Sequence, residues 1–455
     1  MFDNLAYDFV ERAIEIMEKK LHFVFGGFHL GGKSGEEVNT IISHFQRLGV
    51  EKCGATHCTC DQAISMFKEA YRNNYISIGP DKFVTVKHVV LKGSNFDIGR
   101  KIGEIAKKDG AVVSSSDNQI INRAKKEYMA KNYPEMYELM KGVAWSFGLD
   151  ITDDSYDFTG LWQPHAILPA CSVVFFPVGY NENSHSILSR NYDFTTGDFT
   201  GRKPQEGGLA VMARPILFEI HPDQGYSSLS LCAFDYLGGV LDCINSEGLV
   251  VAILAEEESV GKIGREPGDE VGMHELMGMR YLLDNCKNVE EAKEALFSLK
   301  HYYSFIPCHY IIGDRSGKSF IFEFSPNRNR SYIIDGDGPQ CVTNHLVFLH
   351  QNVEEFMETD LNWSMRRYKM LYESIKAKEK FTLEEIAAIN AHVAVPPNAP
   401  ENPQAAPGRT LWYAQYDLQD LTLTVKFYLG EKPDPENEKK VVLEYSPQKV
   451  YELKK

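Results

Sequence analysis

A cysteine, an arginine and an aspartate follow one another in the sequence in an order that could support nucleophilic catalysis. Cys171 follows the small residue Ala170 and opens the apolar run CSVVFFPVGY, and a second run, SILS, leads to Arg190 and Asp193. The two runs predict a β-hairpin that brings Cys171 close to Arg190 and Asp193. A cation beside a thiol lowers the thiol pKa, and the thiolate is the reactive form. The alternative interpretation is a buried cysteine that serves only as a small apolar side chain.

Further motifs follow in a fixed order along most of the chain. They are VVLKGSNFDIGRKIGEIAKK, PEMYELMKGVAWSFGLD, ACSVVFF, SRNYDF, INSEGLVVAIL, NVEEAKEAL, HYIIGDRSGKSFIFEFSP, CVTNHL and RTLWYAQYDLQDLTLTVKFY. From about Val86 to about Gly430 the chain resembles the autoproteolytic N-terminal-nucleophile (Ntn) hydrolases of the acyl-coenzyme A:6-aminopenicillanic acid acyltransferase type. These are relatives of the choloylglycine hydrolases and acid-ceramidase-like amidases. The order and spacing of the motifs together carry this resemblance.

The resemblance implies an enzyme that cleaves its own chain between Ala170 and Cys171. The thiol would attack the preceding carbonyl, and hydrolysis would then free the α-amino group of Cys171. An α-amine has a pKa of about 7.7–8.0 and can act as a base near neutral pH. The resemblance further implies that the thiolate hydrolyses or transfers the acyl group of a linear amide through a thioester, that Asp193 orients the amine, and that Arg190 tunes the site.

Three later residues match other site positions of the resembled family. Asn245, in INSEGL, matches an oxyanion-hole asparagine, and Asn344, in VTNHL, matches a second active-site asparagine. Donors aimed at a developing oxyanion contribute about 3–4 kcal/mol each. Arg409, in GRTLWYAQYD, matches a late arginine that closes the site. An ordinary turn residue remains an equal interpretation for Asn245, and a surface strand residue remains one for Arg409.

The first part of the chain, residues 1–85, resembles the C-terminal end of a metallo-β-lactamase-fold protein of the dihydropterin-linked synthase group. The matching segments are GGFHL around His29, the helix EEVNTIISHFQRLGV and the THCT turn around His57. The family's His-x-His-x-Asp-His metal motif does not occur in the sequence. Because structural zinc uses four protein ligands, His29 and His57 are only weak metal candidates. We expect a partial α/β unit and no metal or other cofactor.

The remaining pattern predicts an α+β fold. Strand-like segments rich in β-branched and aromatic residues alternate with helical segments, and Asn288 and Thr382 are expected to be helix N-caps. Hairpin-rich strands with outer helices predict a four-layer αββα sandwich, which the Ntn-hydrolase resemblance also implies. The expected domains are a partial metallo-β-lactamase-like unit (1–85), the N-terminal segment of the Ntn hydrolase (86–170) and its catalytic domain (171–455). The proline-rich segment 395–408 is expected to form a loop, either a rim over the pocket or a plain connector.

Composition restricts the partners of the protein. The formal net charge is −15, from 48 basic and 63 acidic residues, which makes binding to nucleic acid through phosphate contacts improbable. No apolar stretch reaches the length of a membrane span, and the N-terminus has no signal-peptide core. Nine cysteines without framework spacing fit reduced thiols. We therefore expect a cytoplasmic protein that acts on a small-molecule acyl amide, and a homo-oligomer is left open.

Two other classes of function remain open on the sequence. One is an uncleaved, non-catalytic binding protein of the same fold, and the other is a metal-dependent hydrolase built on residues 1–85. Hydrolase and acyltransferase activities are not separable from sequence, because both form the same thioester and differ only in whether water or an amine resolves it.

Overall fold

The chain forms two compact units in the computed structural model, Met1–Phe83 and Val84–Lys455. The described residues are 5–17, 21–28, 30, 32–56, 59, 61–75, 86–162, 170–197, 202, 212–233, 235–256, 270–304, 307–325, 330–350, 352–356, 361–402 and 405–454. The two weak metal candidates, His29 and His57, lie outside these residues.

The smaller unit combines helices with two parallel strands. The rings of Phe28, Phe45 and Phe67 contact one another in its core, with centroids 5.2 to 5.9 Å apart. Cys53 is fully buried in the same core, and burial raises its pKa to about 12. Cys53 therefore packs as a small apolar side chain in this core. The described elements are α1 (Leu5–Met17), β1 (Phe23–Gly27), α2 (Gly35–Arg47), β2 (Lys52–Thr56), α3 (Asp61–Tyr71) and the short 3-10 helix η2 (Arg72–Asn74).

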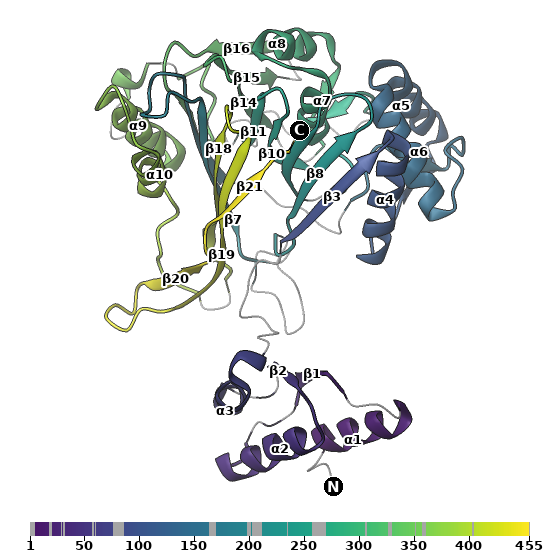
Figure 1. The fold of residues 1–455 in the computed structure, drawn as a ribbon. Coiled ribbons are helices and arrows are strands. Elements are labelled where there is room, and N and C mark those ends of the chain that lie inside the picture. The colour runs from purple at the N-terminus through teal and green to yellow at the C-terminus, as the bar shows by residue number, and fades with distance from the viewer. Residues whose placement is uncertain are drawn as a thin grey trace. The chain divides into compact units, whose positions relative to one another are not determined.

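The larger unit is built on two sheets that lie face to face (Figure 1). The first sheet has the order β16-β15-β14-β11-β10-β9-β8-β3, and only its edge strand β3 is paired in parallel. The second has the order β17-β6-β7-β18-β19-β20, with β21 also paired to β19. The first sheet contains β3 (Lys87–Gly93), β8 (Ile216–Pro222), β9 (Ser228–Cys232), β10 (Val240–Asn245), β11 (Val250–Ala255), β14 (Cys308–Gly313), β15 (Ser319–Ser325) and β16 (Arg330–Asp335). The second contains β6 (Ala170–Phe176), β7 (Ile187–Thr195), β17 (Gln340–Val342), β18 (Gly408–Asp417), β19 (Thr422–Pro433), β20 (Val441–Tyr445) and β21 (Lys449–Glu452).

Helices cover the outer face of each sheet, which confirms the predicted α+β sandwich. Helices α7 and α8 pack on the first sheet, α9 and α10 pack on the second, and α4 packs beside the edge strand β3 (Figure 1). Because the central strands are buried on both faces, their sequences are nearly uninterrupted apolar runs. The helices are α4 (Asn95–Lys108), α5 (Gln119–Asn132), α6 (Pro134–Phe147), α7 (Glu275–Asn285), α8 (Val289–Ser298), α9 (Trp363–Lys376), α10 (Leu383–His392) and the 3-10 helix η4 (Val353–Glu355). Two-stranded pairs form between β4 (Ser114–Ser115) and β5 (Tyr156–Asp157), and between β12 (Met273–His274) and β13 (His301–Tyr302).

Both predicted helix N-caps are confirmed. The Asn288 side chain accepts a hydrogen bond from the Glu291 N–H at the start of α8. Thr382 forms a capping box with Glu385, in which each side chain accepts a hydrogen bond from the other residue's backbone N–H. These bonds satisfy amide groups that have no partner within the helix.

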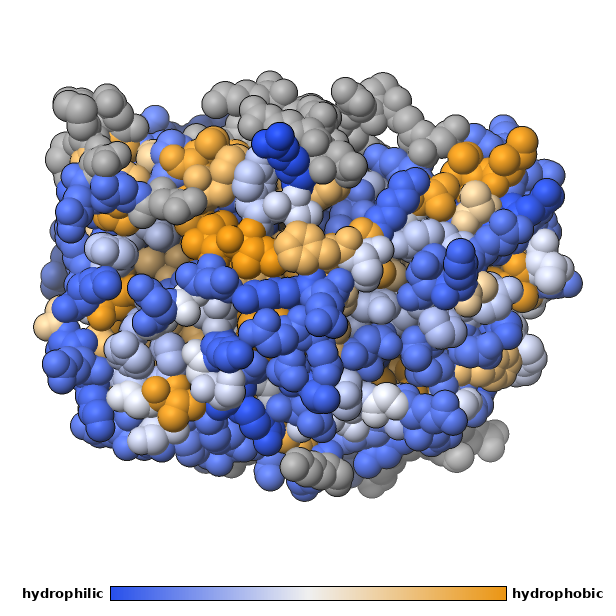
Figure 2. Space-filling view, turned by 90° about the horizontal axis from the view of Figure 1, so that it is seen from above, coloured by the Kyte–Doolittle hydropathy of each residue, from blue (hydrophilic) through white to orange (hydrophobic). Residues whose placement is uncertain are grey.

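The surface seen in Figure 2 is largely hydrophilic, with hydrophobic residues gathered in separate patches. Trp145, Phe297 and Trp363 are among the exposed large apolar side chains. Isolated exposed apolar residues are ordinary on a folded protein. None of the described helices is both long enough and apolar enough to cross a membrane.

We predict that Gly142→Ala destabilises the larger unit, because α4 and α6 approach closely at this glycine. A Cβ atom at Gly142 would lie 2.1 Å from the Phe96 carbonyl oxygen, which is a backbone atom that cannot rotate away. Overpacking of this kind costs about 1–3 kcal/mol of unfolding free energy, measurable by urea denaturation. Lys141→Ala, a partly exposed position on the same helix, is the control and should change stability by less than about 0.5 kcal/mol. Equal stability of the two variants would contradict the close approach.

Candidate active site

The predicted hairpin exists and brings Cys171 to Arg190. Strands β6 and β7 pair antiparallel, with Cys171 opposite Tyr192 and Val173 opposite Arg190. Directly opposed residues of an antiparallel pair share one face of the sheet. The Arg190 Nη2 donates a hydrogen bond of 3.2 Å to the Cys171 sulfur, and both side chains are fully buried.

The side chains of Arg190 and Asp193 lie on opposite faces of β7. Arg190 reaches across to the first sheet, where it contacts β10 and β11. Asp193 instead contacts Arg367 of α9, which covers the outer side of the second sheet. The thiol and Arg190 therefore lie between the sheets, whereas the Asp193 carboxylate lies on the helix side. In the strand register, Asp193 is opposite Ala170, beside the peptide bond predicted to be cleaved.

Arg190 is held by a network between the sheets. Its Nη1 donates to the Asp242 carboxylate at 2.7 Å and to the Leu241 carbonyl at 2.5 Å, and its Nη2 also donates to the Ile253 carbonyl at 2.6 Å. Asp242 in turn accepts hydrogen bonds from Tyr416 at 2.5 Å and from Trp412 at 3.3 Å. Sequence reasoning missed Asp242, although an aspartate inside the apolar strand VLDCIN was a usable signal, because a buried carboxylate needs a partner.

Burial governs the ionisation of the thiol in the uncleaved chain. Burial raises the pKa of Cys171, and the positive charge of Arg190 opposes this only in part. The pKa of Asp193 is likewise raised, first by burial, with the charge of Arg367 and the hydrogen bond from Thr410 acting in the opposite direction. The thiol of the uncleaved chain is therefore neutral at neutral pH and shielded from solvent.

Asn344 lies next to Cys171. Its Oδ1 accepts a hydrogen bond of 2.9 Å from the Cys171 backbone N–H, and its Nδ2 donates to the Ala255 carbonyl at 2.7 Å. The Asn344 backbone N–H donates to the Ser364 hydroxyl at the start of α9. The side chain is thus fixed between β6 and β11, with its oxygen on the nitrogen that cleavage would convert into an amine.

The structure does not bring Asn245 into this cluster. Its Nδ2 donates to the Leu283 and Cys286 carbonyls at the end of α7, and its Oδ1 accepts from the Glu247 and Leu249 N–H groups. Asn245 is the last residue of β10, at the turn that leads to β11, whereas Arg190 and Asn344 bind the Ile253 and Ala255 carbonyls near the far end of β11. Asn245 thus satisfies its own turn and the end of α7 in this structure, and its assignment to an oxyanion hole stays a prediction.

Arg409 is buried but bonded elsewhere. Its Nε donates to Glu431 on β19, and its other nitrogens donate to the Gly408 and Asn398 carbonyls. It fixes the start of β18 to the proline-rich segment and makes no hydrogen bond to Cys171, Arg190 or Asp193 among the residues described. A role in closing the site is not visible in this arrangement.

Three further side chains of the cluster have no signal in the sequence. Arg367 Nη2 and the Thr410 hydroxyl donate to the two oxygens of Asp193, at 2.7 and 2.6 Å. Tyr192 lies opposite Cys171, and its ring stacks on Trp412 with centroids 3.9 Å apart. The buried Tyr192 hydroxyl has no hydrogen-bond partner among the described residues. These contacts join residues far apart in sequence, which no local pattern indicates.

One group of side chains has the composition of a cation site. His185, Asp417 and Asp420 offer ligand atoms within 4.8 Å of one another, at the opposite end of β7 and β18 from Asp193. Asp417 already accepts from His185 and from backbone N–H groups of the following turn. These hydrogen bonds explain why His185 and Asp417 lie close together without a bound ion.

Comparison with known proteins decides the family. A family model described as acyl-coenzyme A:6-aminopenicillanic acid acyl-transferase matches residues 180–432, more than half of the 455 residues. The chain belongs to this family. The Ntn-hydrolase resemblance read from the motifs is confirmed, and with it the prediction that the protein is an enzyme. The match covers Arg190, Asp193, Asn344 and Arg409 and begins after Cys171.

Solved structures similar to this acyl-transferase family member include a hydrolase and an acylase. A mutant of the conjugated bile acid hydrolase from Clostridium perfringens is 16% identical, with a TM-score of 0.41, covering 62% of this chain and 96% of that one. The penicillin V acylase from Agrobacterium tumefaciens is 16% identical, with a TM-score of 0.38, covering 56% and 82%.

A curated protein matches a shorter part of the chain. The 7,8-dihydropterin-6-methyl-4-(beta-D-ribofuranosyl)-aminobenzene-5'-phosphate synthase from Methanocaldococcus jannaschii is 32% identical over 76 residues, covering 16% of this chain. The chain spans about a quarter of the length of that protein, which is covered to 26%. The metallo-β-lactamase resemblance of residues 1–85 stays a prediction.

We predict that Arg190→Met strongly destabilises this acyl-transferase family member. The substitution leaves Asp242 as a buried carboxylate without its cation, which costs about 3–5 kcal/mol of unfolding free energy. The double variant Arg190→Met/Asp242→Asn should lose less than the sum of the two single variants, because removing the second charge relieves the first. Chemical denaturation measures all three.

The control for this cycle is Arg123→Met, which removes a surface ion pair with Asp154. An exposed pair contributes about 0–1 kcal/mol. If the double variant lost as much unfolding free energy as the two single variants together, Arg190 and Asp242 would not be a coupled buried pair.

Proposed function

We propose that this protein is a cysteine-nucleophile Ntn hydrolase or acyltransferase that cleaves itself before Cys171 and then acts on linear amides through a thioester. The observation that supports this most strongly is the environment of one residue. The thiol of Cys171 accepts a hydrogen bond from Arg190, and its backbone nitrogen donates to Asn344. The nucleophile and the future base therefore belong to the same residue, each with its own partner.

The proposed self-cleavage begins with the thiol attacking the Ala170 carbonyl carbon. The C–N bond to Cys171 breaks as the C–S bond forms, the thiol proton passes to the departing nitrogen, and Ala170 is held as a thioester. Water then hydrolyses the thioester to the Ala170 carboxylate and the free thiol. In the uncleaved chain the thiol is buried and neutral, which fits an enzyme that is inactive until the 170–171 bond opens.

In the proposed turnover, the α-amine of Cys171 takes the thiol proton and the thiolate attacks the substrate carbonyl. The amine then returns the proton to the leaving nitrogen, and the acyl group stays on sulfur. Water resolves the thioester in hydrolysis, and an amine resolves it in acyl transfer. Asn344 is proposed to hold the α-amine, and Arg190 to stabilise the thiolate by charge and hydrogen bonding.

Asp193 is proposed to act on the same amine through its position opposite Ala170. Arg367 and Thr410 each bind one of its oxygens, so the carboxylate has a fixed orientation. Its negative charge favours the protonated amine and so raises the amine pKa. The roles proposed for Asn344 and Asp193 are complementary, because one accepts a hydrogen bond from the nitrogen and the other sets its charge.

The runner-up is a binding protein of the same family that stays uncleaved. In that case the buried Cys171 would be a core residue of β6, as the neighbouring Cys341 on β17 is. The two proposals differ in whether the 170–171 bond is intact in the mature protein.

We expect the purified protein to consist of two associated fragments, residues 1–170 and 171–455, as measured by intact-mass spectrometry. Cys171→Ala should give a single chain without amide hydrolysis or acyl transfer. Cys341→Ala, the control, removes another buried thiol of the same sheet and should leave cleavage unchanged. Two fragments from Cys171→Ala would overturn the nucleophile assignment, and one intact wild-type chain would favour the binding protein.

We expect Asp193→Asn to reduce kcat by about a hundredfold, because the α-amine that transfers the proton loses the charge that sets its protonation, and proton transfer by a positioned group contributes at least about a hundredfold. Without the negative charge the amine pKa falls, so the acidic limb of the pH–rate profile should move to lower pH. The unfolding temperature separates this effect from the lost ion pair with Arg367. Asp417→Asn, on β18 outside the cluster, should leave both kcat and the profile unchanged. A cleaved Asp193→Asn enzyme with an unchanged pH profile would make Asp193 a purely structural residue.

A further inference from the structure

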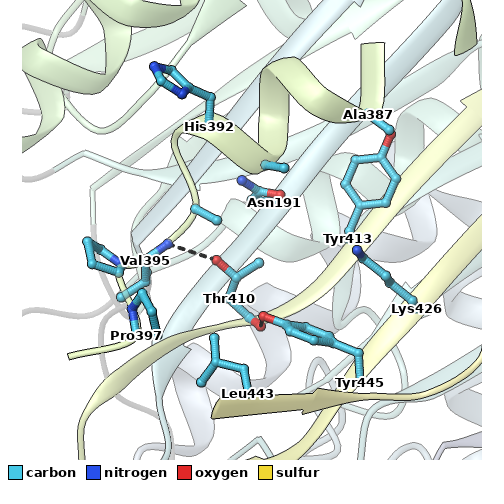
Figure 3. A pocket seen from close by; sticks show the side chains of 13 residues that line it. Asn191, Ala387, His392, Val395, Pro397, Thr410, Tyr413, Lys426, Leu443 and Tyr445 are labelled. Atoms are coloured by element: carbon cyan, nitrogen blue, oxygen red, sulfur yellow. Dashed lines mark hydrogen bonds between the residues drawn. The ribbon is translucent and has the colours of Figure 1, made fainter. Parts of the chain in front are cut away.

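A cavity of about 460 Å³ lies on the helix side of the second sheet, between α10, the start of the proline-rich segment and strands β18 to β20 (Figure 3). Its size is in the range of small-molecule sites. The lining residues come from five stretches of the chain that the fold brings together. They are Asn191, Ala387, Ala391, His392, Ala394, Val395, Pro396, Pro397, Thr410, Tyr413, Lys426, Leu443 and Tyr445.

This cavity is separate from the space around the thiol. Asn191 alternates with Arg190 and Tyr192 along β7, so its side chain lies on the opposite face of the sheet from theirs. Its Nδ2 donates to the Asn390 carbonyl of α10 on that outer side. Cys171 and Arg190 face the first sheet instead. A molecule in the cavity would therefore be divided from the sulfur by the second sheet itself.

The lining combines apolar walls with one permanent positive charge. Alanine, valine, proline and leucine side chains form most of the walls, and the described lining residues include no aspartate or glutamate. Lys426 extends between two tyrosine rings, with its Nζ 5.8 Å from the ring centre of Tyr413 and 5.3 Å from that of Tyr445 (Figure 3). Within the described part of the chain no carboxylate pairs with Lys426. Cation–π contacts fix the direction of an ammonium group but do not neutralise it.

We propose that this cavity binds a small amphipathic carboxylate, with the carboxylate on Lys426 and an aliphatic or aromatic tail against the alanine and proline walls. The Lys426 ammonium would bind the charged end of such a ligand, and the apolar walls would contact its tail. A neutral ligand would leave the lysine without a counter-ion, and a strongly polar one would leave the apolar walls uncovered. The proposal concerns binding alone and does not rest on the nucleophile assignment.

The cavity also shares a residue with the Asp193 cluster. The Thr410 hydroxyl accepts a hydrogen bond of 3.1 Å from the Val395 N–H in the cavity wall (Figure 3). The same hydroxyl donates one of 2.6 Å to Asp193. A ligand that contacts this wall therefore lies two hydrogen bonds away from the Asp193 carboxylate.

The test is isothermal titration calorimetry of the full-length protein with sodium octanoate. We expect saturable binding with one site per chain, and Lys426→Met should weaken it at least about tenfold, which corresponds to the loss of about 1.4 kcal/mol. Lys449→Met, which removes an exposed lysine from the neighbouring strand β21, is the matched control and should leave the affinity unchanged. Octanol, which has the same tail without the charge, should bind at least about tenfold more weakly than octanoate.

A second variant tests the location without touching the charge. Ala387→Phe fills the cavity from α10 and should abolish octanoate binding, with circular dichroism and unfolding temperature confirming a folded protein. Equal affinity in Lys426→Met and Lys449→Met would overturn the proposal, as would undiminished binding to Ala387→Phe. Absence of binding to the wild-type protein up to about 10 mM octanoate would overturn it as well.

Discussion

The structure of the larger unit depends on one buried guanidinium group that connects the two sheets. Arg190 starts from β7 of the second sheet and donates to Asp242 and two backbone carbonyls of the first, and it also reaches the sulfur of Cys171. A buried charge is expensive unless it is paired and hydrogen-bonded. The spacing of the sheets and the position of the thiol are therefore fixed together, and a shift of either sheet would leave the charge uncompensated.

The same constraint explains which polar residues surround Cys171. Asp242 balances Arg190, and Tyr416 and Trp412 donate further hydrogen bonds to Asp242. On the outer side of the sheet, Arg367 and Thr410 do the same for Asp193. Two carboxylates, one on each side of the second sheet, thus lie near Cys171, and each is held by its own arginine. Because the two ion pairs lie on opposite sides of the sheet, the Arg190–Asp242 pair can act on the sulfur of Cys171 and the Arg367–Asp193 pair on its nitrogen.

Sequence reasoning succeeded where the relevant contacts are local or repeat along a strand. The apolar runs around Cys171 and Arg190 predicted the hairpin that β6 and β7 form. The oxyanion role of Asn245 stays a prediction, because its side chain bonds here to its own turn and to the end of a helix that is distant in sequence, contacts that its motif does not indicate. Contacts between separate elements carry no local signature, since they depend on sheet order and helix placement. The residues found only from the structure are Tyr192, Asp242, Arg367, Thr410 and the lining of the outer cavity.

The position of strand β3 has a consequence for a chain opened before Cys171. Strand β3 precedes the break, yet it pairs with β8 along its whole length from Lys87 to Gly93, at the edge of the first sheet. Tyr133, at the start of α6, also precedes the break, and its hydroxyl donates to Asp284 of α7, which follows it. A nicked molecule would thus be a natural split protein, whose halves share one sheet and hold each other without a covalent link. Such halves, produced as separate polypeptides, are suited to reconstitution by fragment complementation, with the smaller unit carried along on the first half.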